Sequence, residues 1–473
     1  MKEQLFEEFT KITDHSLEIS SRGVKVVDQE KFQSVVHRLA EISAFEAGER
    51  QAMARYLVRA AAADLGIYPA SIHELYMARG RGDVPNTFTV PAMNLRVMAF
   101  DCARAVFKAA NDINGAAIIF EIARSEMTYS DQRPAEYTTS ILAAAIAEGY
   151  RGPVFIQGDH FQVSAKRYKA DPVAEIESLK TLIQEALTAG FFNIDVDTST
   201  LVDIDKPTVE EQQVLNVELS AMLTAYIRDQ QPGSIEISIG GEIGEVGGHN
   251  STVEELKAYL DGFNKELKRI NPKAKGLSKI SIQTGTSHGG VVLPDGSIAT
   301  VNVDFDTLRN LSRVARKDYC LGGTVQHGAS TLPQDAFSKF VEYEAIEVHL
   351  ATNFMTMFFD RIPTNLREEM YAYLRENYAS ERKADMTDEQ FYYKTRKNVI
   401  GPFKKQSWNL PADVKFVIVS AWEEQFRKLF ASLGVAGTRT YVDKYIKPVV
   451  LVPDLKDYLG EVAGAEDISD LAD

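Results

Sequence analysis

The sequence is poor in cysteine and has no long hydrophobic run. Only Cys102 and Cys320 occur among its 473 residues, so we expect no disulfide framework, and a zinc site built from several thiolates is excluded. No stretch approaches the ~18 consecutive apolar residues of a membrane span, and the N-terminal residues lack the apolar centre of a signal peptide. These absences predict a cytoplasmic protein with no membrane partner.

The sequence also has no excess of positive charge. Lys and Arg number 52 against 67 Asp and Glu, which gives a formal net charge of −15. A chain this acidic is not expected to bind nucleic acid or an anionic membrane in general, although a local basic pocket for a phosphate is compatible with it. Neither a Walker phosphate loop nor a strand-linked dinucleotide motif occurs, which argues against a kinase or a dehydrogenase.

Hydrophobic periodicity divides the chain into three parts. Residues 1–86 have helical spacing, residues 87–365 alternate between short β-rich runs and amphipathic helices, and residues 366–473 return to helical spacing. The predicted strands are 87–94, 116–123, 154–160, 191–198, 235–243, 279–285, 320–328 and 345–352.

Eight alternating units predict a (β/α)8 barrel as the catalytic domain, with an N-terminal helical segment and a C-terminal helical extension. A doubly wound open sheet uses the same local pattern. We prefer the barrel because an open sheet would not naturally give eight units with polar residues at nearly every C-terminal strand end.

Histidine is scarce, and its distribution is informative. Five of the eight histidines fall at or just past the ends of predicted strands, and three of these, His160, His288 and His327, lie beside glycine in tight contexts. Three neutral imidazoles with one position left open are a usual catalytic zinc arrangement. Because the C-terminal strand ends of a barrel converge at one mouth, the pattern predicts a metalloenzyme. A lone strand-end histidine would more often be a hydrogen-bonded structural residue.

Other polar residues give secondary expectations. Glu242, within a glycine-rich segment, is a candidate additional ligand. Asp195 and Asp197 are expected to stabilise the loop after their strand, with a metal or cation role as the alternative. Packing or surface positions are expected for three histidines of the N-terminal part, namely His15, His37 and His73.

Taken in order along the chain, these motifs resemble a class II, metal-dependent fructose-bisphosphate/tagatose-bisphosphate aldolase. The resemblance runs from about Val90 to Phe354. It rests on the Asp-His pair at 159–160, the Glu-x-Gly turn at 242–244, the GTSHG run at 285–289, and the segment VDFDTLRNLSRVARKDY followed by QHGAS. Each motif is weak alone, but each falls on its expected strand.

The resemblance implies one catalytic zinc ion per subunit, with another divalent metal as an alternative. His160, His288 and His327 would hold the ion, Glu242 would be the additional ligand, and Asp159 would be the acid/base group beside the substrate carbonyl and hydroxyl. Zinc would polarise the ketone and stabilise the enediolate, so no Schiff-base lysine is needed. The implied substrate- and phosphate-binding positions are Asn94, Ser125, Gly289, Gly328, Ser330, Thr352 and Asn353.

Two departures from the family pattern affect the substrate and the proton shuttle. The N-x-D-T-D pattern of the eighth strand is replaced here by H-L-A-T-N, which begins at His349 and places Ala351 where an acidic residue is expected. We therefore expect a substrate preference shifted away from fructose 1,6-bisphosphate. The mobile glutamates after the double glycine are replaced by His249 and Asn250, so the catalytic proton shuttle is expected to be Glu245 or His249.

The predicted function is a lyase of carbohydrate metabolism, such as glycolysis. It would cleave or form a ketose phosphate by retro-aldol or aldol chemistry, with dihydroxyacetone phosphate as a product and a sugar phosphate as its small-molecule partner. The alternative is a non-catalytic partner subunit of a tagatose-bisphosphate-type aldolase, which the long helical C-terminus also resembles. Another barrel metalloenzyme, such as a hydrolase, is disfavoured because the first strand lacks an H-x-H pair. The resemblance further implies a homodimer or homotetramer.

Overall fold

Eight parallel strands close into a barrel in the computed structural model, which describes residues 2–20, 23–233, 235–244, 249–286, 293, 302–458 and 471. The strands are β4 (Val90–Asn94), β5 (Ile119–Ala123), β6 (Gly152–Gln162), β7 (Asn193–Asp197), β8 (Ser238–Glu242), β9 (Lys279–Ile282), β10 (Thr324–Gln326) and β11 (Glu347–Leu350). Each pairs with the next in chain order, and β11 pairs with β4 to complete the ring. The predicted (β/α)8 barrel is confirmed, and each strand overlaps a predicted run.

Helices surround the barrel and connect its strands. They are α6 (Ala99–Asp112), α7 (Arg124–Tyr129), α8 (Pro134–Ala147), α9 (Ala165–Ala170), α10 (Pro172–Ala189), α11 (Val209–Gln212), α12 (Val214–Gln230), α13 (Val253–Ile270), α14 (Phe305–Tyr319), α15 (Phe337–Glu342) and α16 (Thr352–Phe359). Several begin at a capping side chain: Asp171, Thr252 and Asp304 each accept a hydrogen bond from a backbone N–H in the first turn of the helix that follows. Such caps satisfy N–H groups that have no partner within the helix, so they fix where the helix begins.

The N-terminal part contains strands as well as the predicted helices. Its elements are α1 (Lys2–Ile12), β1 (Leu17–Ser20), β2 (Gly23–Val26), α2 (Gln29–Val35), α3 (His37–Phe45), α4 (Gly48–Asp64), β3 (Ile67–Ala70) and α5 (His73–Gly80). Strand β3 pairs in parallel with the first four residues of β6, outside the closed ring. It contains Pro69, which an edge strand tolerates because one side of it needs no ladder hydrogen bond. The expectation of a purely helical segment therefore missed a hairpin and an edge strand.

The C-terminal part is helical, as predicted. It comprises α17 (Thr364–Asn377), α18 (Asp388–Thr395), α19 (Lys404–Trp408), α20 (Ala412–Ser432) and α21 (Arg439–Tyr445). Trp422 is fully buried and donates its indole N–H to the carbonyl of Phe354 at 3.0 Å, which fastens α20 to α16. Both terminal parts contribute to the same buried cluster as the barrel, and the division of the chain at 86/87 and 365/366 stays a prediction.

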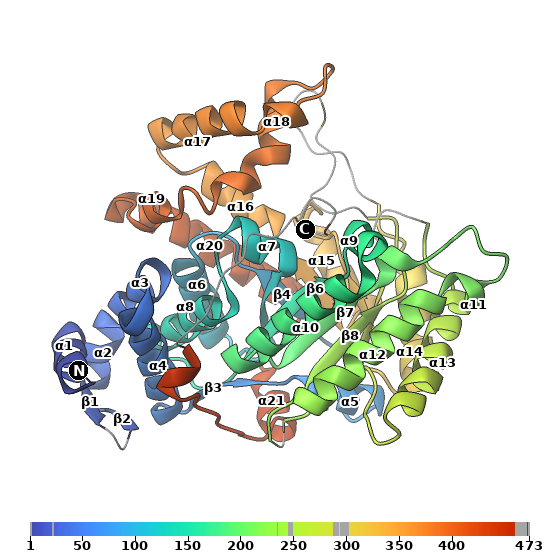
Figure 1. Cartoon of the computed structure of the whole chain (residues 1–473), viewed down its shortest axis with the longest axis horizontal. Helices are drawn as coiled ribbons and strands as arrows, with labels where there is room; N and C mark the ends of the chain where they lie inside the picture. The colour runs from blue at the N-terminus through green and yellow to red at the C-terminus, as the bar shows by residue number, and fades with distance from the viewer. Residues whose placement is uncertain are drawn as a thin grey trace.

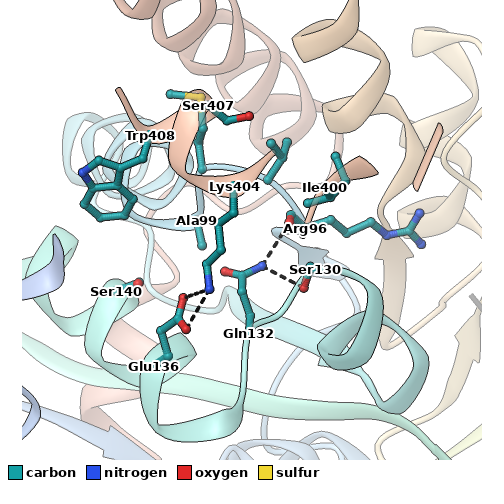
Figure 2. Close-up of a pocket in the computed structure, with 12 residues that line it drawn as sticks. Arg96, Ala99, Ser130, Gln132, Glu136, Ser140, Ile400, Lys404, Ser407 and Trp408 are labelled. Carbon is teal, nitrogen blue, oxygen red and sulfur yellow. Dashed lines mark hydrogen bonds and ion pairs between the residues drawn. The ribbon is translucent and has the colours of Figure 1, made fainter. Parts of the chain in front are cut away.

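An ion pair with a buried carboxylate joins the C-terminal part to the barrel helices. Lys404 reaches from α19 to Glu136 on α8, with Nζ at 2.8 Å from Oε1 and 2.9 Å from Oε2. Figure 2 shows this pair beside Gln132, whose amide donates to the carbonyl of Arg96 at 2.9 Å. Arg96 lies just beyond the end of β4, so these contacts connect the extension to the mouth of the barrel.

The two faces of the barrel differ in what covers them. Helices α7, α9 and α16, which follow C-terminal strand ends, lie in Figure 1 on the same side of the barrel as α17 and α18, whereas α5 and α21 lie on the opposite side. Among the described helices, none combines the length and the apolar character that a membrane crossing needs.

Candidate metal centre and active site

Polar side chains from six strands converge at one end of the barrel. They are Asn94 (β4), Asp159 and His160 (β6), Asp195 and Asp197 (β7), Glu242 (β8), His327 directly after β10, and His349 (β11), and all of them are buried. Active sites of this fold lie at the C-terminal ends of the strands. Among the predicted site residues that are described, the structure thus brings together Asn94, Asp159, His160, Glu242 and His327.

Asp159 and His160 lie within a strand rather than at its end. The pairing of β6 with β7 shifts register between Gly158 and Phe161, and His160 has a φ of 38°. Adjacent side chains of a regular strand point to opposite faces, whereas a bulge with a left-handed residue re-aims them, so both residues contact groups at the mouth. Gly158 is required at the bulge, because a Cβ there would lie 2.3 Å from the Phe161 ring. The expectation that the strand ends here is corrected accordingly.

His160, Glu242 and His327 form a group suited to hold a metal ion. One ligand atom from each lies within 4.8 Å of the others, and the two imidazole rings have centroids 4.3 Å apart. Two imidazoles and a carboxylate are a donor set that zinc and related divalent ions accept. The predicted third histidine, His288, lies outside the described residues. The described residues therefore fit the implied metal.

A carboxylate behind His160 holds its ring in place. Asp197 Oδ2 lies 3.0 Å from His160 Nδ1, while Asp197 Oδ1 accepts hydrogen bonds from the backbone N–H and hydroxyl of Ser199 at 3.0 and 2.7 Å. A metal-binding histidine usually gives its second nitrogen to such a carboxylate, which fixes the tautomer and leaves the other nitrogen for the metal. Asp197 thus stabilises the loop after its strand, as expected, and also orients a ligand, which the sequence did not reveal.

Glu242 lies between the His160 ring and the side-chain amide of Gln283. Its Oε2 lies 3.4 Å from His160 Nδ1, and its Oε1 accepts from Gln283 Nε2 at 3.1 Å. Burial, followed by the negative charge of Asp197, raises the pKa of Glu242 to about 7. A bound cation would favour the ionised form and reverse this shift, because it stabilises the negative charge directly.

Asp159 lies against the metal group and is ionised in the metal-free protein. Burial alone would raise its pKa, but the imidazoles of His160 and His349 outweigh burial and hold the pKa well below its usual range. Asn94 Nδ2 donates to Asp159 Oδ2 at 2.9 Å and to Glu126 Oε2 at 2.7 Å. A buried carboxylate with a fixed direction suits proton exchange with a bound substrate.

The buried Arg96–Glu126 pair supports this arrangement. Arg96 Nε donates to Glu126 Oε1 at 2.6 Å, and Glu126 Oε2 also accepts from the backbone N–H of Ala123 at 2.8 Å. Glu126 thereby fixes the orientation of the Asn94 amide, and Asn94 in turn fixes the orientation of the Asp159 carboxylate. Sequence reasoning found Asn94 and missed Glu126, because nothing in the RSEM segment distinguishes a buried glutamate from an exposed one.

His349 occupies the centre of a buried charge network. Its Nδ1 lies 3.1 Å from both Asp159 Oδ1 and Glu121 Oε1, and its Nε2 lies 2.7 Å from Glu347 Oε1. Although burial disfavours the charged form, the carboxylates of Glu121 and Asp159 raise the pKa of His349 well above its usual value. His349 therefore stands beside Asp159 as an imidazolium in the metal-free protein.

Lys279 completes this network below the mouth. Its ammonium lies 2.9 Å from Asp195 Oδ1 and 2.5 Å from Glu347 Oε1, and it donates to Gln157 Oε1 at 2.8 Å. Glu121, Asp195, Glu347 and His349 also have ligand atoms within 4.8 Å of one another. Because Lys279 already supplies a cation to two of these carboxylates, we interpret this group as a structural charge network.

The predicted phosphate-binding residues that are described lie around the start of α16. Ser330 Oγ accepts from the backbone N–H of Ala351 at 2.7 Å, Thr352 is the first residue of the helix, and Asn353 follows it. Gly328 has a left-handed φ of 68°, which allows the turn directly after His327. Gly289 lies outside the described residues.

Three further predicted site residues are Ser125, His249 and Glu245. Ser125 is buried in α7. His249 is 62% exposed and its Nε2 pairs with Glu255 Oε1 at 2.6 Å, so in this arrangement its side chain is turned away from the buried ligands. Glu245 lies outside the described residues. Of the three histidines expected to pack or to lie on the surface, His15 and His37 are exposed and His73 is buried.

A closed barrel with histidines and carboxylates gathered at the C-terminal strand ends defines a class of metal-dependent barrel enzymes. The model of one family, described as "Fructose-bisphosphate aldolase class-II", matches residues 84–404. Because this match covers more than half of the chain, the chain belongs to the class II fructose-bisphosphate aldolase family, a metal-dependent family of lyases.

Several solved structures are similar to the chain at low sequence identity. A putative fructose-1,6-biphosphate aldolase from Coccidioides immitis is 16% identical with a TM-score of 0.46, over 77% of this chain and 96% of that one. The YdjI aldolase from Escherichia coli K12 is 12% identical with a TM-score of 0.46, over 78% and 99%. A probable tagatose 6 phosphate kinase from Sinorhizobium meliloti 1021 is 14% identical with a TM-score of 0.49, over 78% and 96%. No curated protein sequence matches the chain.

Proposed function

We propose that the protein is a zinc-dependent aldolase that cleaves a ketose phosphate into dihydroxyacetone phosphate and an aldehyde. The observation that carries the proposal is the convergence of His160, Glu242 and His327, with the carboxylate of Asp159 3.9 Å from His160 Nε2. A divalent metal at this centre supplies a Lewis acid that polarises the ketone and offsets the negative charge that develops during cleavage.

The proton transfers of the cleavage are assigned to residues of the chain. Asp159 accepts the proton of the hydroxyl on the carbon that becomes the aldehyde, and the bond between this carbon and the neighbouring carbon of the ketone half breaks. The electron pair of that bond passes to the dihydroxyacetone phosphate half, which then takes up a proton. Glu245 or His249 is the proposed donor of this proton, since both belong to the segment after β8.

The phosphate of the ketone half is proposed to bind at the start of α16. Backbone N–H groups at a helix N-terminus attract anions, and the Thr352 hydroxyl lies at the first position of this helix. The hydroxyl of Ser330, on the loop after β10, lies close enough to accept a hydrogen bond from Ala351 N. Together these groups define the phosphate end of the substrate.

His349 supports a shifted substrate preference. It places an imidazolium beside Asp159, while Ala351 offers no carboxylate two residues further on. The change in charge next to the proton-transferring group favours a ketose that differs from fructose 1,6-bisphosphate in stereochemistry or in charge.

A panel of ketose phosphates tests the proposal directly. The zinc-loaded protein is incubated with each compound, and dihydroxyacetone phosphate is detected through a coupled reduction. We expect kcat/KM to be highest on a compound other than fructose 1,6-bisphosphate. If kcat/KM is highest on fructose 1,6-bisphosphate, the shifted substrate preference is refuted but the aldolase reaction is not. If no ketose phosphate is cleaved, the aldolase reaction is refuted and the non-catalytic subunit is favoured.

We also propose that the enzyme acts in the cytoplasm as a homodimer or homotetramer in carbohydrate metabolism. Its family membership supports this proposal. Light scattering coupled to size-exclusion chromatography tests the oligomeric state, and a monomer at micromolar concentration would contradict it.

A further inference from the structure

The N-terminal face of the barrel, opposite the metal ligands, has a strongly basic hollow of about 500 Å³. It lies between the end of α5, the segment that leads into β4, and the last turns of α14, so it belongs to the face on which the strands begin. Figure 1 shows α5 on the side of the barrel away from α16. Its basic lining residues are Arg79, Arg81, Arg313, Arg316 and Lys317, and its described lining includes no carboxylate.

Nearby acidic residues compensate only part of this charge. Asp83 pairs with Arg81 at 3.0 Å. Glu344 pairs with Arg313 at 2.7 Å and also with Arg316. Two carboxylates thus form ion pairs with three of the five basic side chains.

The other two cations have no carboxylate partner among the described residues. Arg79 is 1% exposed and donates to Asn86 Oδ1 at 2.9 Å and to the backbone carbonyls of Phe88 and Ala345. These acceptors are neutral. Lys317 is exposed and makes no ion pair within the part of the chain that the structure describes. An excess of positive charge therefore remains in the hollow.

Helix dipoles explain the position of these cations only in part. Arg79 is in the last turn of α5, and Arg316 and Lys317 are in the last turn of α14, where positive side chains are favoured. Three hydrogen bonds hold the buried Arg79 guanidinium in place, and Glu344 offsets only part of the repulsion from Arg316 beside it. Burial, followed by the charge of Arg316, lowers the pKa of Arg79 to about 9.

The hollow is also rigid, because the two helix ends that form it are in direct backbone contact. A Cβ on Gly80 would lie 2.2 Å from the carbonyl oxygen of Cys320, the residue that caps the C-terminus of α14. Only glycine permits this approach. The backbone positions that carry Arg79, Arg316 and Lys317 are therefore fixed relative to one another.

We propose that this basic hollow binds a small anion with a diphosphate group, either free pyrophosphate or the diphosphate of a nucleotide. The arginines supply an excess of positive charge over Asp83 and Glu344, and Lys317, which makes no ion pair among the described residues, adds a flexible point charge at the rim. The space is larger than a single phosphate requires, and Val84 and Pro85 are the described apolar side chains that line it. A site on this face is separate from the aldolase centre and goes beyond the proposed reaction.

Isothermal titration of the metal-loaded full-length protein with pyrophosphate tests this proposal. The test variant is Arg313→Gln/Lys317→Gln, which removes two exposed cations and leaves Glu344 paired with Arg316. The matched control is Lys268→Gln/Arg269→Gln, which makes the same change in charge in the last turn of the neighbouring helix α13. A second control is His327→Ala, which damages the metal centre.

We expect one site per chain that survives His327→Ala and Lys268→Gln/Arg269→Gln, and an affinity at least tenfold lower in Arg313→Gln/Lys317→Gln. Unchanged aldolase turnover of this double variant would show that the barrel is intact. ADP titrated in parallel distinguishes the two sources: equal affinities indicate recognition of the diphosphate alone, and tighter ADP binding indicates a nucleotide.

Three results would overturn the proposal. They are no binding of either probe to the wild-type protein, equal loss of affinity in both double variants, or loss of binding in His327→Ala alone. Binding of a random RNA that requires Arg313 and Lys317, without binding of either small probe, would also overturn it in favour of a polyanion surface.

Discussion

Replacing Asp197 with asparagine should weaken metal binding while leaving the barrel folded. In the wild-type protein Asp197 uses one oxygen for His160 Nδ1 and the other for Ser199. An asparagine of the same shape has only one oxygen. If that oxygen keeps the two hydrogen bonds from Ser199, the amide NH2 faces His160 Nδ1 and opposes the tautomer that presents Nε2 to the metal.

The size of the effect follows from the role of such partners. Loss of a carboxylate behind a metal-binding histidine typically lowers metal affinity by about 10–100-fold, which corresponds to about 1.4–2.8 kcal/mol. Gln162 Nε2 also donates to Asp197 Oδ2, at 2.5 Å, so in the variant this donor would face the amide NH2 and lose its acceptor. We therefore expect the upper part of this range.

A competition titration with a zinc chelator of known affinity measures the change. Asp171→Asn is the matched control, because Asp171 caps α10 on the outside of the barrel and asparagine caps nearly as well. At saturating zinc the Asp197→Asn variant should recover most of its turnover. Zinc affinity equal to that of the control would refute the assignment of His160 as a ligand oriented by Asp197.

Three further predictions concern single side chains. Asp159→Ala should retain zinc but lose about 10²–10⁴ in turnover; near-normal turnover with zinc bound would exclude Asp159 as the proton-transferring group. Thr352→Val should raise KM for a ketose phosphate with little change in kcat, because it removes a hydroxyl donor and keeps the shape; an unchanged KM would place the phosphate elsewhere. Burial raises the pKa of Glu136 to about 7 despite Lys404. A carboxyl whose pKa is raised in the folded state contributes its full stability below its unfolded pKa, near 4.5, and loses it as the pH rises through about 7. Urea titrations from pH 4.5 to 8 should therefore show the wild type losing stability relative to Glu136→Gln, and parallel curves would contradict the shift.

The barrel could be predicted from the sequence because its strands are short, apolar and separated by amphipathic helices. The C-terminal ends of the strands also indicated a barrel, because histidine and carboxylate residues recur where parallel strands meet. Strand β3 could not be found this way, because four residues that include Pro69 resemble a turn. Its place beside β6 depends on tertiary contacts such as those of the Asn193 amide, which bonds to Ala70 and Ile156.

The metal ligands of the candidate site could be predicted from the sequence. The buried residues that hold these ligands and Asp159 in position could not. His160, Glu242 and His327 stood out by residue type and by their neighbours. Glu126, Lys279 and Glu347 did not, because an acidic or basic residue within a buried run gives no local sign of its partner. Lys279, for example, meets Glu347 across 68 residues of sequence.

The most direct test of the central claim is to measure metal content and activity on the same sample. We expect about one zinc or other divalent ion per chain by elemental analysis, loss of retro-aldol turnover when a chelator removes it, and recovery when zinc is returned. A protein that cleaves a ketose phosphate at full rate with no bound divalent metal would contradict the assignment of this centre.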